Sequence, residues 1–129
     1  MNSVIDILNT KSELLHGTGV LEQQINDAED ALNLHFASDY KEYLRKYAIV
    51  AFEGRELTGI TASKWVDVVT VTKTERERNP EERKKLYVVE QTNIDDIVYW
   101  QSEDGRIYRT YGNESPELAY ESFVEYLSE

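Results

Sequence analysis

The chain has no cysteine, only two prolines and six scattered glycines, and 14 basic side chains against 25 acidic ones. Without cysteine, a disulfide framework, a thiol nucleophile and a cysteine-ligated zinc or iron–sulfur centre are all excluded. The glycines form neither a Gly-x-Gly-x-x-Gly pattern nor a P-loop, so no phosphate-binding loop is indicated. No segment is apolar for long enough to be a signal peptide or a membrane span, and we therefore expect a soluble cytoplasmic protein.

Histidine is nearly as scarce, since His16 and His35 are the only two. Neither stands at metal-ligand spacing from another histidine, which argues against zinc. We expect His35, next to Phe36, to pack at a helix junction rather than to act in catalysis. A Gly-x-Ser-x-Gly nucleophile motif is also missing. The sequence therefore predicts no catalytic residue, no cofactor and no metal site.

Pairs of nearby carboxylates are the remaining candidates for acid–base or metal chemistry. The pairs are Asp95–Asp96, Glu103–Asp104, and Glu53 with Glu56. Such chemistry needs two carboxylates in unlike environments, whereas sequence neighbours in turns usually face solvent. Asp95 and Asp96 follow Ile94 at the entry to a predicted strand, where turn-forming aspartates are common. A small hydrolase that uses a carboxylate pair stays open as a less favoured alternative to a binding protein.

The negative charge is concentrated near the C-terminus. Of the formal net charge of −11, residues 86–129 contribute most, with ten acidic and two basic side chains. A surface of this sign repels nucleic acid and anionic membranes, and it accelerates encounter with a basic protein. Acidic surfaces also simply favour solubility, so both interpretations remain open. A length of 129 residues predicts a single domain, residues 1–129, that buries a core of its own.

Hydrophobic spacing predicts helices in the N-terminal half. Apolar residues recur at steps of four, three and four from Leu21 to Leu32, and Asn33 follows as a stop signal. A second helix carries one apolar stripe, which we assign to the core: Tyr40, Tyr43, Leu44 and Tyr47. A short helix within residues 1–17 packs through Val4, Ile5 and Leu8. Residues 49–52 predict a strand, and Gly54 and Gly59 after it permit positive φ in a tight connection.

The C-terminal half predicts strands followed by one helix. Residues 86–90 have a buried-strand pattern, and residues 98–101 and 107–111 form a hairpin around Asp104–Gly105. Ser115–Pro116–Glu117 resembles a helix start. A helix from there would align Glu117, Glu121 and Glu125 as an acidic ridge at i,i+4 spacing. The basic residues between Arg76 and Lys85 are interspersed with glutamates, which favours a solvated loop over a nucleic-acid site.

Several short motifs occur in an order that resembles one known superfamily. They are Phe36–Leu44, Gly54–Gly59, Val66–Val69, Thr74 with Arg78, Tyr87–Glu90, Ile94–Asp95 and Ser122–Phe123. Together they resemble the SUKH superfamily, bacterial immunity proteins related to fungal cell-wall-synthesis regulators, over roughly residues 21–127. Ala37 stands where many members carry proline. For residues 63–79, a β-branched run favours a strand, but the resemblance implies a helix that carries Thr74 and Arg78, and we adopt the helix.

Taken together, the sequence predicts a Smi/Knr-like α+β fold, with N-terminal helices and a C-terminal helix packed against a largely antiparallel sheet. The resemblance implies an immunity protein, not an enzyme, that neutralises the toxic C-terminal domain of a cognate bacterial toxin, often a nuclease. The partner would be a protein toxin with a basic surface, not nucleic acid or membrane, and the chain a monomer or weak dimer. The main alternative is a cytoplasmic scaffold that regulates another protein.

The predicted interface combines aromatic rings with carboxylates, because rings supply desolvated area and acids supply steering. Strand alternation places Tyr99 and Trp100 on opposite faces, so that one of the two should face outward. The predicted partner-binding residues are Asp95, Asp96, Tyr99, Trp100, Glu103, Asp104, Tyr111, Glu114, Glu117 and Glu121.

Overall fold

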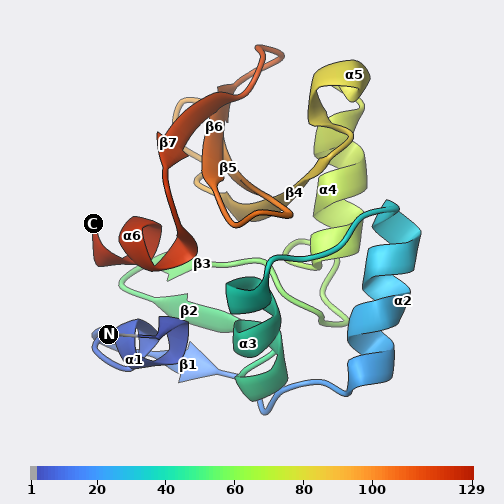
Figure 1. Cartoon of the computed structure of the whole chain (residues 1–129). Helices are drawn as coiled ribbons and strands as arrows, with labels where there is room; N and C mark the ends of the chain where they lie inside the picture. The colour runs from blue at the N-terminus through green and yellow to red at the C-terminus, as the bar shows by residue number, and fades with distance from the viewer. Residues whose placement is uncertain (1–2) are drawn as a thin grey trace.

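A computed structural model describes residues 3–129 of the chain (Figure 1). Its helices are α1 (Val4–Leu8), α2 (Glu22–Leu32), α3 (Ser38–Lys46), α4 (Val68–Arg76), α5 (Pro80–Arg83) and α6 (Phe123–Ser128). Its strands are β1 (Leu15–His16), β2 (Val50–Phe52), β3 (Arg55–Glu56), β4 (Leu86–Gln91), β5 (Ile97–Ser102), β6 (Ile107–Tyr111) and β7 (Glu117–Tyr120). Strands β1 to β3 form one antiparallel sheet and β4 to β7 form another, each in sequence order. The predicted α+β class is confirmed.

The N-terminal helices agree with the hydrophobic spacing. Ser3 caps α1 through a reciprocal pair of hydrogen bonds with Asp6, and α2 ends where Asn33 adopts a left-handed conformation with φ of 56°. The short strand β1 was not predicted. Every helix among residues 3–129 is too short or too polar to cross a bilayer.

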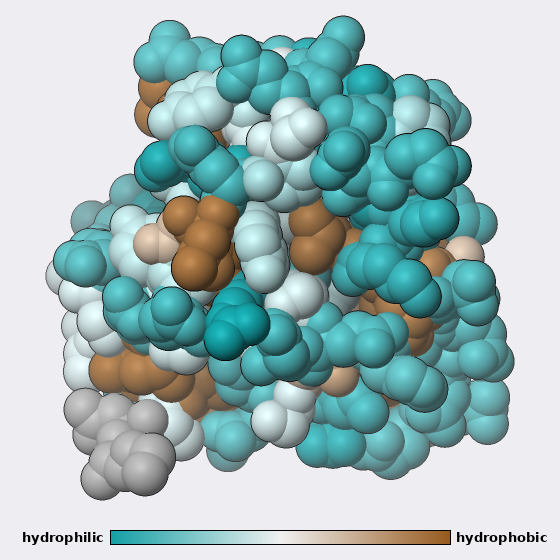
Figure 2. Space-filling view, turned by 45° about the horizontal axis from the view of Figure 1, so that its top comes forward, coloured by the Kyte–Doolittle hydropathy of each residue, from teal (hydrophilic) through white to brown (hydrophobic). Residues whose placement is uncertain are grey.

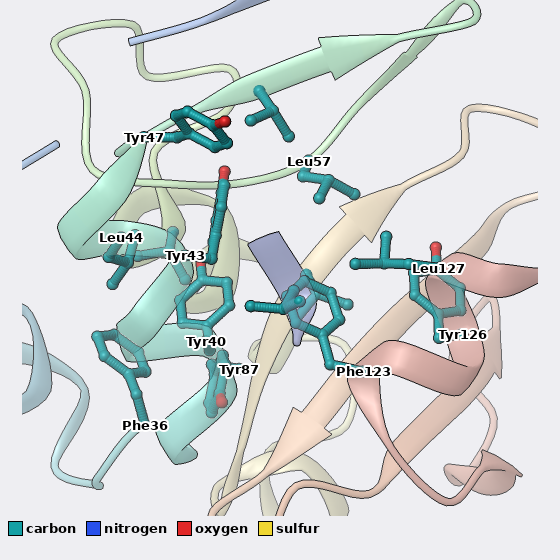
Figure 3. Packing of buried hydrophobic residues seen from close by; sticks show 14 of the residues in the cluster. Phe36, Tyr40, Tyr43, Leu44, Tyr47, Leu57, Tyr87, Phe123, Tyr126 and Leu127 are labelled. Atoms are coloured by element: carbon teal, nitrogen blue, oxygen red, sulfur yellow. The ribbon is translucent and has the colours of Figure 1, made fainter. Parts of the chain in front are cut away.

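Aromatic side chains from α3, β4 and α6 form the centre of the core (Figure 3). The ring of Tyr40 lies 5.0 Å from that of Tyr87 and 6.0 Å from that of Phe123, centroid to centroid. The hydroxyl of Tyr43 donates to the carbonyl of Thr58 at 2.6 Å, so the buried phenol is satisfied. The assignment of the tyrosine stripe to the core is confirmed.

Ala37 precedes α3 with φ of −64°, a value that proline would also adopt. Its backbone N–H, however, donates to the hydroxyl of Tyr87 at 2.9 Å. Proline has no N–H and would leave this buried hydroxyl without that donor. Alanine at this position, where many members of the superfamily carry proline, therefore keeps a buried hydrogen bond to Tyr87.

The two glycines after β2 serve different purposes. Gly54 has φ of 77° in the β2–β3 turn, as predicted. The same expectation for Gly59 is wrong, because Gly59 is not among the residues with positive φ. A Cβ atom there would lie 1.8 Å from the carbonyl oxygen of Ala48, so glycine is needed for close backbone approach.

The four-stranded sheet is covered on both faces. On one face, Trp100 packs with Val71 of α4 and with Leu86 and Val88. On the other face, Tyr99 lies 4.8 Å from the ring of Tyr126 in α6, and Figure 1 shows α6 between the two sheets. The predicted hairpin at Asp104–Gly105 is confirmed. Tyr99 and Trp100 do point to opposite faces, but Trp100 is fully buried, and its prediction as an interface residue is wrong because α4 covers that face.

The predicted helix from Ser115 onward is wrong over its first half. Residues 117–120 form β7, which pairs with β6, and α6 begins only after Ser122 caps it. Glu117 is held in the strand register beside Arg109, with which it forms an ion pair at 2.8 Å. Because Glu117 and Glu121 precede α6, the acidic ridge with Glu125 does not exist.

The helical interpretation of residues 63–79 is confirmed for α4 only, since residues 63–67 lie before the helix and Arg78 lies beyond its end. The prediction of a solvated basic loop is wrong at Arg83, which is fully buried in α5. Arg83 donates to the carbonyls of Glu75, Gly112 and Glu114 at 2.6–2.9 Å. Its guanidinium lies 5.3 Å from the centroid of the Trp100 ring.

Candidate partner-binding site

A cleft of about 440 Å³ opens where the β2–β3 hairpin, the β4–β5 connection, β7 and α6 meet. We call it the tyrosine cleft. It is lined by Gly54, Arg55, Glu56, Glu90, Gln91, Thr92, Asn93, Ile94, Tyr99, Tyr120, Tyr126 and Glu129. Residues from both sheets and from the last helix therefore create a concave surface that no single sequence segment defines.

An arginine–glutamate pair forms the floor of the tyrosine cleft. Arg55 donates to Glu90 from two nitrogens, at 2.7 and 3.0 Å, and the hydroxyl of Tyr126 donates to the same carboxylate. Glu90 is only 3% exposed, and its hydrogen bond to Arg55 raises the pKa of the guanidinium. Burial, reinforced by the Glu90 charge, raises the pKa of Tyr126. The network holds the β2–β3 hairpin to β4 and α6.

A β-bulge explains why Glu90 points into the tyrosine cleft. Val88 pairs with Trp100, whereas Glu90 pairs with Tyr99, so Val89 is the extra residue in β4. Such an insertion reverses the side-chain alternation that follows it. Glu90 consequently lies on the tyrosine face of the sheet rather than beneath α4.

Three tyrosines form one wall of the tyrosine cleft. The ring of Tyr126 is 4.8 Å from that of Tyr99 and 5.4 Å from that of Tyr120. Tyr126 is buried behind the other two, which are partly exposed. Desolvation raises the pKa of Tyr120, so its hydroxyl stays protonated at neutral pH. Rings fixed in this way offer contact area to a ligand without a large loss of side-chain entropy.

Two large, exposed apolar side chains lie at the tyrosine cleft or at the hollow that adjoins it. Ile94 lines the tyrosine cleft and is 64% exposed. Trp65 is 77% exposed and lines a smaller hollow, which shares Glu56, Gln91 and Asn93 with the tyrosine cleft. Figure 2 shows one face of the molecule on which apolar side chains lie in small separate groups among hydrophilic ones. Exposed aromatic residues beside a concavity are typical of protein-binding surfaces.

The tyrosine cleft is poorly arranged for acid–base chemistry. Both oxygens of Glu90 accept hydrogen bonds, and its charge is balanced by Arg55. A general acid or base instead needs a proton-transfer position open to substrate. Within residues 3–129, no three acidic or histidine side chains gather in a way that would hold a metal ion. The arrangement is suited to recognition of another molecule by stacking and charge.

The predicted partner-binding residues do not form one surface. Asp95, Asp96, Tyr111 and Glu114 lie at the end of the sheet near α5, where Arg78 pairs with Asp96 at 2.5 Å. Arg78 holds the pKa of Asp96 below its usual value. Arg109 lies 5.4 Å from the centroid of the Tyr111 ring.

A second group, made of Glu103, Asp104 and Glu121, lies at the turn of the β5–β6 hairpin. Arg106 forms ion pairs with both Asp104 and Glu121 at 3.2 Å, so these two acids are partly neutralised. Glu103 accepts from the backbone N–H of His35 at 2.8 Å. The expectation that His35 is packed is wrong, because its side chain is 81% exposed. Of the predicted set, the tyrosine cleft contains only Tyr99.

Sequence reasoning missed Arg55, Glu90, Tyr120 and Tyr126 as site residues. Glu90 did carry a signal, because a glutamate ends the otherwise apolar run that begins at Leu86. The start of α6 was also marked by Ser122 and Glu125 at capping-box spacing. That signal would have placed Tyr126 on the helix and left Tyr120 outside it.

Comparison with known families gives one finding. A family model described as "SUKH_5: SMI1-KNR4 cell-wall" matches residues 1–129. A search of curated proteins gave no significant match. The match covers every segment that contributes to the tyrosine cleft.

Proposed function

The chain belongs to the SMI1-KNR4 family of the SUKH superfamily, and on that premise we propose that it is an immunity protein for a bacterial polymorphic toxin. The superfamily is known for proteins of the immunity type and is not a known enzyme family. In the proposal, the protein binds the toxic C-terminal domain of its cognate toxin, a nuclease domain with a basic groove, and thereby blocks it. Family membership over residues 1–129 carries this proposal.

Charge supports the choice of a basic partner. Residues 86–129 carry ten acidic and two basic side chains, and the whole chain has a net charge of −11. The ion pairs of Arg106 and Arg109 neutralise individual acids but leave the net excess unchanged. A nuclease must present cations to nucleic acid, so an acidic inhibitor competes for the same groups and is steered toward them.

The surface features support protein binding rather than catalysis. The tyrosine cleft carries partly exposed rings, the exposed Trp65 lines the hollow that adjoins it, and the buried carboxylate of Glu90 is already paired with Arg55. Aromatic anchors in a concave, polar-rimmed surface are the usual composition of an interface. We propose the tyrosine cleft as the contact surface and assign long-range steering to the acidic residues of the β5–β6 hairpin.

Co-expression with the toxin encoded beside the gene tests the proposal. We expect the two proteins to purify together, and we expect the purified chain to inhibit the toxin at a one-to-one ratio. A neighbouring toxin that remains fully active in excess of this protein would contradict the immunity function. Capture of a housekeeping enzyme without effect on the toxin would instead favour the regulatory scaffold.

A charge-neutralised variant tests the electrostatic part separately. Its substitutions are Glu103→Gln, Asp104→Asn, Glu114→Gln, Glu117→Gln and Glu121→Gln. We expect slower association with the toxin and a weaker dependence of that rate on salt. An unchanged rate and salt dependence would remove steering from the mechanism but leave binding intact.

A further inference from the structure

The uncompensated charge in the tyrosine cleft is negative. Arg55 is the only cation among its lining residues, and Glu90 already pairs with it at 2.7 Å. Two further carboxylates line the tyrosine cleft, those of Glu56 and Glu129, and both are exposed. Among residues 3–129, no basic side chain lies within ion-pair distance of either one. A ligand that enters the tyrosine cleft therefore meets two acids without partners beside a wall of rings.

The protein itself shows how a guanidinium is accommodated at this place. Arg55 lies 5.1 Å from the ring centroid of Phe52 and 5.4 Å from that of Tyr126, while both of its hydrogen-bonded nitrogens face Glu90. A planar guanidinium stacks on aromatic faces and pairs with carboxylates at the same time, which an ammonium group does less well. Tyr99 and Tyr120 repeat the aromatic half of this arrangement on the open side.

We propose that the tyrosine cleft receives an arginine side chain of the partner protein, which packs against Tyr120 and pairs with Glu56. This inference rests on the proposed function, because it specifies which chemical group of the partner the immunity protein recognises. It gives the acidic charge a short-range role in addition to steering. It also predicts a preference for arginine over lysine and over an apolar side chain of similar length.

An NMR titration of the full chain with small arginine probes tests the proposal without knowledge of the partner. The probes are the N-acetyl amides of arginine, lysine and norleucine, each added to tens of millimolar. We expect saturable shifts from the arginine probe at the backbone amides of Glu56, Gln91 and Tyr120, weaker binding of the lysine probe, and the weakest binding of the norleucine probe. Equal binding of the three, or arginine shifts elsewhere on the surface, would overturn the proposal.

Two variants sharpen the test. Glu56→Gln should weaken binding of the arginine probe by about two- to fivefold, the range expected for an exposed ion pair. Glu42→Gln removes the same charge at an exposed position on α3, a helix that contributes no lining residue, and should leave the affinity unchanged. If both variants weakened binding of the arginine probe equally, the affinity would depend only on net charge, which would contradict a defined arginine site.

This test and the test of immunity fail independently. A chain that inhibits its toxin but binds no arginine probe retains the proposed function and loses this inference. A chain that binds the probe in the tyrosine cleft but inhibits no toxin retains the site and loses the function.

Discussion

The two faces of the four-stranded sheet each hold an arginine against an aromatic ring, yet the two arrangements differ in exposure. Under α4 and α5, Arg83 and Trp100 are both fully buried. Beneath α6, Arg55 lies over Tyr126 but remains partly exposed at the tyrosine cleft. Arg83 donates to three backbone carbonyls and lies 3.8 Å from the Glu75 carboxylate, whereas Arg55 donates from two nitrogens to the carboxylate of Glu90.

We interpret the buried arginine, Arg83, as a contribution to stability and the partly exposed one, Arg55, as part of a binding surface. The sealed arrangement has no room for a ligand and ties α5 to the connection between β6 and β7. The open arrangement fixes the floor of a concavity whose tyrosine wall and outer carboxylates remain available. The same pair of residue types therefore serves the fold on one face and, in our proposal, a partner on the other.

The largest contrast is expected between the two tryptophans. Trp100→Ala should lower the free energy of unfolding by about 3–5 kcal/mol, because it removes a fully buried ring and its hydrogen bond to Thr110. Trp65→Ala should change it by less than about 0.5 kcal/mol, since that ring is exposed. Urea denaturation measures both, and similar losses would show that the exposed tryptophan also supports the fold.

Arg83→Met is expected to have the next largest effect. It leaves three backbone carbonyls without their donor and should cost about 3 kcal/mol of unfolding free energy. Lys84→Met, at an exposed neighbouring position, is the matched control and should cost almost nothing. A loss below about 1 kcal/mol at Arg83 would mean that water replaces the guanidinium and that this face is not sealed.

The open arrangement should show coupling between its two charges. Glu90→Leu alone should cost about 2 kcal/mol, because it strands the charge of Arg55 and the hydroxyl of Tyr126. The double variant with Arg55→Met should cost less than the sum of the single variants by about 1 kcal/mol. Additive losses of unfolding free energy in this double-mutant cycle would show that Arg55 and Glu90 do not stabilise each other at the floor of the tyrosine cleft.

The smallest effect concerns pH at the exposed end of the sheet. Arg78 lowers the pKa of Asp96 from its usual 3.8, so the pair stabilises the fold above that pH and the contribution is lost as pH falls through the lowered pKa. Asp96→Asn should therefore lower Tm slightly at pH 7 and have no effect once the pH is below the lowered pKa of Asp96. Asp95→Asn, also at positive φ but outside the ion pair of Arg78 with Asp96, is the matched control and should lower Tm less at pH 7 than Asp96→Asn does.

Short sequence patterns correctly predicted the helices and the turn whose conformation depends mainly on neighbouring residues. Periodicity located α2 and α3, and the Asp104–Gly105 dipeptide located the β5–β6 hairpin. Strand β7 was mistaken for helix because its pairing with β6, rather than the preference of its own residues, decides its conformation.

The tyrosine cleft was not predicted because its formation depends on distant parts of the chain. The bulge at Val89 turns Glu90 toward Arg55, which lies 35 residues earlier, and α6 supplies Tyr126 from 36 residues later. The burial of Arg83 likewise depends on carbonyls 29 and 31 residues away. No short window of sequence contains either relationship.

The central claim is that the tyrosine cleft, rather than the acidic hairpin turn, contacts the toxin. Calorimetric titration of the cognate toxin domain should compare wild type with a Trp65→Ala, Tyr120→Ala variant and a Glu103→Gln, Asp104→Asn variant. We predict that affinity falls at least about tenfold for the first variant and less than about threefold for the second. The opposite order, with binding lost only when the hairpin acids are neutralised, would contradict the account.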